Sequence, residues 1–195
     1  MKKLFITTLF IVFYFLPLSL KAEIKPILEG NKNAKINLIV YESLTCNHCA
    51  NFHLKIYPKL KETYIDIGIA NIEFRNFPLD MAALNASKIA HCKNDGNSEI
   101  LHYLFDKQNE WVKGNTIPEI NKNLNKIIKE SKTFHNLKLD ECLANKKLED
   151  HILEDRIEGA KKFKVEATPT LIINGEKFEN PLNYKKLQKY LDKLI

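Results

Sequence analysis

Residues 36–52 read INLIVYESLTCNHCANF, and this stretch decides the fold. Its first six residues are apolar or β-branched apart from one asparagine, which predicts a strand over residues 36–41. From Cys46 onward, apolar side chains recur every three to four residues as far as Tyr64, which predicts a helix with one buried face. Pro58 is expected to kink or split that helix, because proline lacks a backbone N–H. The pair Cys46 and Cys49 therefore stands at the junction between a strand and a helix.

The rest of the chain predicts an α/β fold with a helical insertion. Residues 72–77 alternate in polarity and stop at a proline, so residues 23–80 contain a βαβ unit. Residues 81–145 show helical periodicity and almost no strand signal, and we expect them to pack as a small bundle of their own. Residues 146–195 then return to the first unit with a helix, a hairpin turned at Asn174-Gly175 and an amphipathic last helix.

Residues 1–22 have the pattern of a secretory signal peptide that is cleaved near Ala22, with a basic start and an apolar run over residues 4–16. A retained membrane anchor is the less favoured alternative, because the run is shorter than the ~20 residues that span a bilayer. Loss of Lys2, Lys3 and Lys21 lowers the formal charge from +6 by three, to about +3. The remaining lysines and glutamates are interleaved, as on a solvated surface. We therefore expect an exported, soluble, monomeric protein with no nucleic-acid partner.

The sequence Cys46-Asn47-His48-Cys49 predicts thiol chemistry. Two cysteines three residues apart in the first turn of a helix lie on one side of it and can form a disulfide. Unpaired N–H groups at the start of a helix favour an anion, so Cys46 is predicted to be the exposed, reactive thiolate and Cys49 the buried resolving thiol. We expect His48, with Asn47 beside it, to stabilise that thiolate. A stabilised thiolate favours the reduced form, which makes the disulfide form a stronger oxidant.

The other two cysteines, Cys92 and Cys142, stand far apart in the sequence. A zinc site built on Cys46 and Cys49 would need two more ligands at matching spacing, and these two residues do not form such a pair, so we expect no metal. Four cysteines in an exported chain are an even number, which favours a structural disulfide between Cys92 and Cys142. The alternative is a second redox pair that regulates the first.

A proline at position 169 precedes the last predicted hairpin, in the sequence Thr168-Pro169-Thr170. A cis peptide bond there would place backbone beside the cysteines, where a substrate chain could pair with it as an added strand. The alternative is an ordinary trans proline that opens an edge strand, and composition alone favours that alternative.

These motifs together resemble the DsbA-like periplasmic disulfide oxidoreductases of the thioredoxin superfamily, and the likeness covers nearly all of residues 23–195. The resemblance implies a thioredoxin fold with an inserted helical domain and a cis bond at Pro169. It implies a periplasmic enzyme that needs no cofactor and oxidises dithiols of newly exported polypeptides through Cys46 and Cys49. It also implies a quinone-linked, DsbB-like membrane partner that reoxidises the pair.

This chain departs from the family pattern at several positions. Asn47 stands where the commonest dipeptide has proline, and Val40 stands where many relatives carry a buried acid. Glu42, two residues further along the strand, could replace that acid as a proton acceptor for Cys49, but we expect a solvated strand-end carboxylate. Thr168 stands where DsbA has valine and isomerases have threonine, so an isomerase or reductase is the second hypothesis. A non-catalytic binding module that borrowed the fold is the third.

Overall fold

The computed structural model describes residues 23–195, and the predicted signal peptide lies outside the described residues. In chain order the elements are β1 (Ile27–Gly30), β2 (Ile36–Glu42), α1 (Asn47–Asn51), η1 (Phe52–Ile56), α2 (Tyr57–Leu60), η2 (Lys61–Ile65), β3 (Ala70–Asn76), α3 (Met81–Ala90), α4 (Glu99–Asp106), α5 (Gln108–Trp111), α6 (Ile117–Glu130), α7 (Leu139–Ala144), α8 (Lys146–Lys162), β4 (Thr170–Ile173), β5 (Glu176–Phe178) and α9 (Tyr184–Leu191). The predicted α/β fold with helices inserted after the second predicted strand is confirmed.

One sheet of five strands, in the order β1-β3-β2-β4-β5, forms the centre of the fold. Strands β2 and β3 are parallel, as the helical crossover between them requires, and the other neighbours are antiparallel. Strand β1 was not predicted, because its four residues end in Glu29-Gly30 and read as a polar lead-in. It forms because it pairs with β3, and its first side chain, Ile27, is only 2% exposed.

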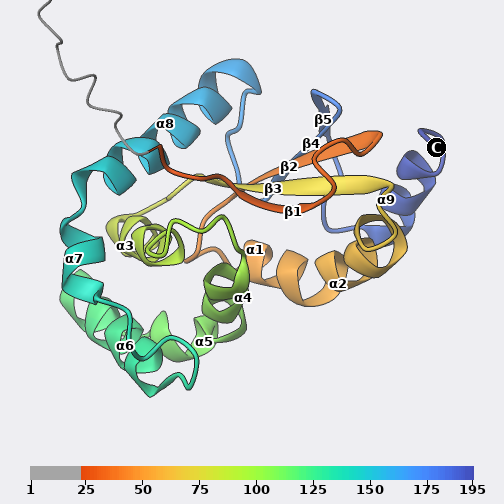
Figure 1. Cartoon of the computed structure of the whole chain (residues 1–195). Helices are drawn as coiled ribbons and strands as arrows, with labels where there is room; N and C mark the ends of the chain where they lie inside the picture. The colour runs from red at the N-terminus through yellow and green to blue at the C-terminus, as the bar shows by residue number, and fades with distance from the viewer. Residues whose placement is uncertain (1–22) are drawn as a thin grey trace, which may run out of the picture.

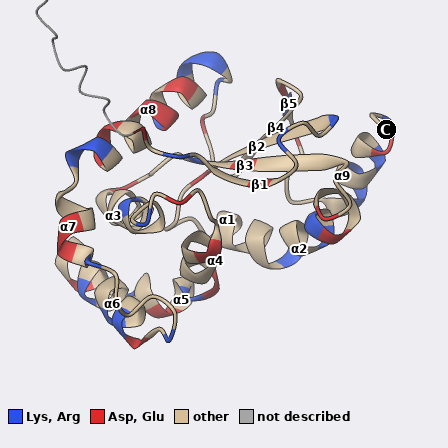
Figure 2. Ribbon diagram, viewed as in Figure 1, with Lys and Arg blue, Asp and Glu red and all other residues tan. Residues whose placement is uncertain are grey.

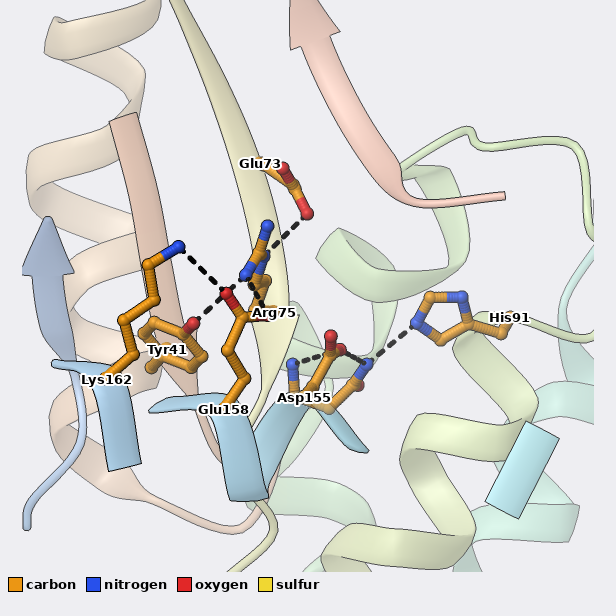
Figure 3. A network of polar contacts seen from close by, with 8 residues as sticks. Tyr41, Glu73, Arg75, His91, Asp155, Glu158 and Lys162 are labelled. Atoms are coloured by element: carbon orange, nitrogen blue, oxygen red, sulfur yellow. Dashed lines mark hydrogen bonds and ion pairs between the residues drawn. The ribbon is translucent and has the colours of Figure 1, made fainter. Parts of the chain in front are cut away.

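Helices cover both faces of the sheet (Figure 1), with α8 on one face and α1, α2 and α9 on the other. Gly159 lets α8 approach β2 closely, since a Cβ there would lie 2.7 Å from Cε1 of Tyr41. A polar network ties the same helix to β3 (Figure 3): Arg75 donates to Glu158 at 2.7 Å, and Asn76 donates to Asp155 at 2.8 Å. The position of α8 is therefore fixed by a close backbone approach and by paired polar groups.

The helix that carries the cysteines runs from residue 47 to residue 65 with two π-helical stretches, η1 and η2. The backbone N–H of Tyr57 bonds to the carbonyl oxygen of Phe52, five residues back, at the end of η1. Pro58, which has no N–H, follows directly, so the expected disturbance takes the form of a π-turn in a helix that continues.

The inserted helices α3–α7 share one apolar core with the sheet. Buried side chains such as Leu104, Phe105 and Ile128 belong to the same cluster as Val40 and Phe52. The predicted small bundle of inserted helices is therefore joined to the sheet, because α4 packs against the cysteine-bearing helix. Trp111 also lies in this core, since its side chain is 0% exposed and its N–H donates to the carbonyl of Leu104 at 2.8 Å.

Charged residues gather on the helices, and the strands are largely uncharged (Figure 2). Both lysines and acidic residues lie along α6 and α8, and some of them form ion pairs between residues four positions apart. Within residues 23–195, no helix has the length and apolarity needed to cross a membrane.

Candidate active site

Cys46 is the N-cap of α1, with an extended backbone (φ −81°, ψ 119°). Its carbonyl oxygen accepts the N–H of Ala50 at 3.1 Å, so the helix begins directly after it. The Cys46 side chain is partly exposed, whereas Cys49, one turn later, is 0% exposed and packs in the core. The structure therefore presents one thiol to solvent and hides the other.

A buried glutamine that sequence reasoning missed holds the loop before the helix. The side-chain amide of Gln108, on α5, donates to the carbonyl of Leu44 at 2.8 Å and to that of Cys46 at 3.1 Å. Gln108 is only 2% exposed. Because the loop and α5 are more than sixty residues apart, no local signal in the sequence connects them.

The peptide bond between Thr168 and Pro169 is cis. It brings the carbonyl oxygen of Thr168 to 3.3 Å from the Cys46 sulfur, which donates to it as a thiol. A cleft of about 410 Å³ opens beside this contact, lined by His48, Thr168, Pro169, Glu179, Asn180, Pro181, Leu182 and Asn183. Leu182 is 40% exposed at its edge. The cysteine pair and the proline loop, which are 122 residues apart in the chain, thus form one site.

The two thiols have opposite acidities. A hydrogen bond from the Cys49 thiol, together with Thr168 and the backbone N–H groups of Cys49 and His48, outweighs partial burial and lowers the pKa of Cys46 to about 5. Burial raises the pKa of Cys49 well above the ordinary thiol value, and the nearby Cys46 and Glu42 raise it further. At neutral pH the pair is therefore one thiolate and one thiol, the state that attacks a disulfide.

Alkylation of the reduced protein tests this assignment. The rate at which Cys46 reacts with iodoacetamide is expected to rise with pH, because only the thiolate reacts. The midpoint of this rise should lie near pH 5, with a plateau at higher pH. Thr168→Val is expected to move the midpoint upward, since Oγ1 of Thr168 is buried without a hydrogen-bond partner in residues 23–195 and is free to donate to the thiolate. Mass spectrometry should find no label on Cys49. A midpoint near pH 9 in the wild type would contradict the assignment.

Glu42 does not lie in solvent, so that expectation was wrong. The residue is 4% exposed and lies on the face of β2 that packs against the cysteine-bearing helix. Its Oε2 is 2.6 Å from Nε2 of His53, and Nδ1 of His53 is 3.0 Å from Nδ1 of His102. Nε2 of His102 is in turn 2.8 Å from Oε1 of Glu29. These three partners were not recognised as a group from the sequence, because they come from three separate elements.

Cys92 and Cys142 form a disulfide in the structure, with their Cα atoms 5.3 Å apart. The bond joins the end of α3 to α7, so it closes a loop within the inserted helices. Among residues 23–195, no group of three or more histidine, cysteine, aspartate or glutamate side chains is arranged to hold a metal ion.

The chain matches known families along nearly its whole described length. A family model described as "Thioredoxin" matches residues 22–193. The Rickettsia bellii protein named "Putative protein-disulfide oxidoreductase" is 31% identical over 168 residues, which are 85% of this chain and 63% of that protein. Disulfide bond formation protein D of Bacillus subtilis is 24% identical over 178 residues, covering 87% of this chain and 76% of that protein.

The fold also matches a solved structure of a similar protein. The crystal structure of Wolbachia pipientis alpha-DsbA1 has a TM-score of 0.75 and 31% sequence identity, and the match covers 92% of this chain and 93% of that chain. By contrast, this chain spans only 63% of the length of the Rickettsia bellii relative and 55% of that of Rickettsia typhi.

Proposed function

This chain belongs to the thioredoxin family, and within it to the DsbA-like disulfide oxidoreductases, and from that premise we propose that it oxidises paired thiols of exported polypeptides. The reactive species is the disulfide between Cys46 and Cys49, and the electrons leave through a second partner. One observation carries the proposal. The Cys46 sulfur stands at the start of a helix, beside the carbonyl oxygen of Thr168 and the cis bond to Pro169.

The reaction consists of two exchanges. A substrate thiolate attacks the Cys46 sulfur of the disulfide, a new S–S bond joins substrate and Cys46, and Cys49 leaves and takes up a proton. A second substrate thiolate then attacks the first substrate sulfur and releases Cys46 as a thiolate. The substrate loses two electrons and gains a disulfide, and the Cys46–Cys49 pair gains those electrons. The low pKa of Cys46 makes it a good leaving group in the second exchange.

The cleft beside Cys46 suits an extended peptide. Thr168 and Pro169 are among the residues that line it, and a substrate strand can pair its own N–H and C=O groups with backbone there. The exposed Leu182 offers an apolar contact at the edge of the cleft. We propose that this cleft holds the segment of substrate that carries the reacting cysteine.

The location and the second partner are part of the same proposal. The pattern of residues 1–22 supports export to the periplasm. Disulfide formation persists in that compartment only when the oxidant is regenerated, so we propose a DsbB-like, quinone-linked membrane protein as the electron acceptor. The mature protein is proposed to act as a monomer.

Equilibration with glutathione tests the direction of the reaction. We expect a potential for the Cys46–Cys49 pair above about −200 mV, well above the value of about −270 mV for thioredoxin. The reason is the depressed pKa of Cys46, which stabilises the reduced folded form. That stabilisation is fully present above the ordinary thiol pKa of 9 and is lost as the pH falls through about 5, so the preference for oxidation should weaken towards pH 5.

A reductase or isomerase is the second candidate, and Thr168 before the proline favours it. A thioredoxin-like potential would support this candidate and contradict the oxidase proposal. A third reading, a binding module without catalysis, would require that no exchange occurs at Cys46 at all.

A further inference from the structure

A line of hydrogen-bonded side chains leads from the neighbourhood of Cys49 to the protein surface. It runs from Glu42 to His53 (2.6 Å), from His53 to His102 (3.0 Å) and from His102 to Glu29 (2.8 Å). These four residues, from β2, η1, α4 and β1, are called the relay residues below. Every link is within normal hydrogen-bond distance, so the line has no gap.

The line begins in the dry interior and ends near solvent. The side chains of Glu42 and His53 are 3% and 2% exposed, whereas those of Glu29 and His102 are 16% and 28% exposed. Aromatic rings enclose the middle of the line. The ring of His53 stacks on Phe105 with centroids 4.0 Å apart, and that of His102 stacks on Tyr57 with centroids 4.6 Å apart. Water therefore reaches the outer end of the line and not the inner end.

The inner end of the line faces the buried thiol. Oε1 of Glu42 is buried and has no hydrogen-bond partner among residues 23–195, although an unpaired buried oxygen is costly. Glu42 lies on the same face of β2 as Val40, which packs in one cluster with Cys49, and an ionised Glu42 raises the pKa of the Cys49 thiol. One oxygen of Glu42 is thus bound into the line, and the other is free to accept a proton.

The protonation states give the line a direction. Burial raises the pKa of Glu42 well above its ordinary value, which favours the protonated carboxyl, and burial lowers the pKa of His53 to about 3, so the imidazole is neutral. Burial also tends to raise the pKa of Glu29, but hydrogen bonds from His102, Ser98 and Tyr57 outweigh this and lower it to about 2. A neutral imidazole has one donor and one acceptor nitrogen. When Glu42 is protonated, one choice of tautomers satisfies all three links: Glu42 donates to His53, His53 donates to His102, and His102 donates to the Glu29 carboxylate.

Other titratable groups that face the line lie at its two ends. At the inner end, a charge on Cys46 raises the pKa of Glu42, and a charge on Glu42 raises the pKa of Cys49. Around Glu29, the Tyr57 hydroxyl donates to Oε2, and the ammonium group of Lys61 lies 3.6 Å from the same oxygen. The cation and the hydroxyl keep the outer carboxylate ionised, so it is able to receive a proton.

We propose that the relay residues carry the proton of Cys49 between the buried thiol and the surface during disulfide exchange, a role that rests on the proposed function. When Cys49 attacks Cys46 in a mixed disulfide, its proton passes to Oε1 of Glu42. At the same time the Oε2 proton moves to His53, the Nδ1 proton of His53 moves to His102, and the Nε2 proton of His102 moves to Glu29. The Cys46–Cys49 bond forms, the bond from Cys46 to the partner sulfur breaks, and the partner leaves as a thiolate.

The reverse reaction uses the same line. When a substrate expels Cys49 from the disulfide, Glu42 gives the new thiolate a proton and is reprotonated from the surface through His102 and His53. In this scheme Glu42 exchanges a proton directly with Cys49 and is the candidate catalytic residue, whereas His53, His102 and Glu29 act through Glu42. Without such a line, the proton of a thiol that is 0% exposed would need a local opening of the core to reach water.

The resolution step of the reaction with oxidised glutathione isolates this role. Reduced protein is mixed with oxidised glutathione, and the reaction is quenched with acid at set times. Mass spectrometry then measures the fraction of protein that carries a glutathione adduct. The first phase, attack by Cys46, forms the glutathione adduct, and the second phase, attack by Cys49, removes it. We expect Glu42→Gln to slow the second phase by about 10²-fold and His102→Gln by about tenfold, because each removes a proton acceptor. The first phase should change less than about twofold, since it needs no proton from Cys49.

The pH profile separates a proton path from mere support of the fold. The wild-type second phase should vary little between pH 6 and 8, whereas in His102→Gln it should rise with pH, because water or hydroxide must replace the line. Glu29→Asp should keep most of the wild-type rate. His91→Gln is the matched control, because His91 is also buried, at 3% exposure, but bonds to Asn76 away from the line. Its second phase should equal that of the wild type.

The possible results separate the two proposals. A wild-type protein that forms no adduct overturns the proposed function. A wild type that forms and resolves the adduct, with Glu42→Gln and His102→Gln variants that resolve it equally fast, overturns the relay alone. The relay is also overturned if the His102→Gln variant resolves the adduct slowly but its rate is as independent of pH as that of the wild type. The histidine would then only support the fold.

Discussion

Replacing Cys49 with alanine is expected to leave the protein covalently joined to its substrates through Cys46. Cys46 loses the hydrogen bond from the Cys49 thiol, but Thr168 and the backbone N–H groups of residues 48 and 49 still lower its pKa, so it still attacks and is still attacked. The intramolecular attack of Cys49, which normally breaks the mixed disulfide, is lost, because no other free thiol is present in the described residues. Groups held together in this way react as if at very high concentration, so the mixed disulfide should last at least about 10³-fold longer than in the wild type.

Alanine is the right replacement at this buried position. Cys49 is 0% exposed in an apolar core, so a serine hydroxyl would be buried without a partner, whereas alanine removes only the sulfur. The measurement is the recovery of disulfide-linked adducts from a periplasmic extract by non-reducing electrophoresis and mass spectrometry. Cys46→Ser is the control, since serine is also a good N-cap and preserves the helix start. It should form no adducts. If Cys49→Ala also forms none, the chain does not act by thiol–disulfide exchange.

The sheet and most helices could be predicted from the sequence because their signals are local. Apolar spacing defines the cysteine-bearing helix, and Asn174-Gly175 defines the hairpin between β4 and β5. Strand β1 could not be predicted in this way. Its four residues have no pattern of their own, and they become a strand only because the edge of β3 offers unpaired N–H and C=O groups.

The reactive part of the site was visible in the sequence, and its surroundings were not. The spacing of three residues between Cys46 and Cys49 is enough to predict a redox-active pair at the start of a helix. The burial of Glu42 depends on a histidine that lies one helical turn beyond Cys49 and on α4, which belongs to the inserted segment far along the chain. One local signal was available: Glu42 shares a strand face with the buried Val40, and His53 shares a helix face with Cys49. Nothing local pointed to Glu29 or His102, which are 73 residues apart.

Removing the disulfide between Cys92 and Cys142 should have the largest effect on stability. The bond links residues 50 apart, and the loss of conformational entropy that such a loop imposes on the unfolded chain corresponds to about 4 kcal/mol. Cys142 is also buried at 6% exposure, so its replacement by alanine removes some apolar contact. The double variant Cys92→Ala/Cys142→Ala is therefore expected to unfold at a clearly lower urea concentration.

The comparison should be made in a chain that carries Cys46→Ala and Cys49→Ala in both samples, so that the 92–142 bond is the only disulfide that differs.

Replacing Cys92 and Cys142 with alanine in the active protein, which keeps Cys46 and Cys49, distinguishes a structural bond from a regulatory one. The bond lies among the inserted helices, between the end of α3 and α7, and the reactive pair has its own partners at Thr168 and Glu42. If the bond is structural, its removal should change the reduction potential of the Cys46–Cys49 pair by less than about 30 mV relative to the wild type, which corresponds to about 1.4 kcal/mol. A larger shift, with little change in the free energy of unfolding, would instead make Cys92 and Cys142 a second redox pair that controls the first.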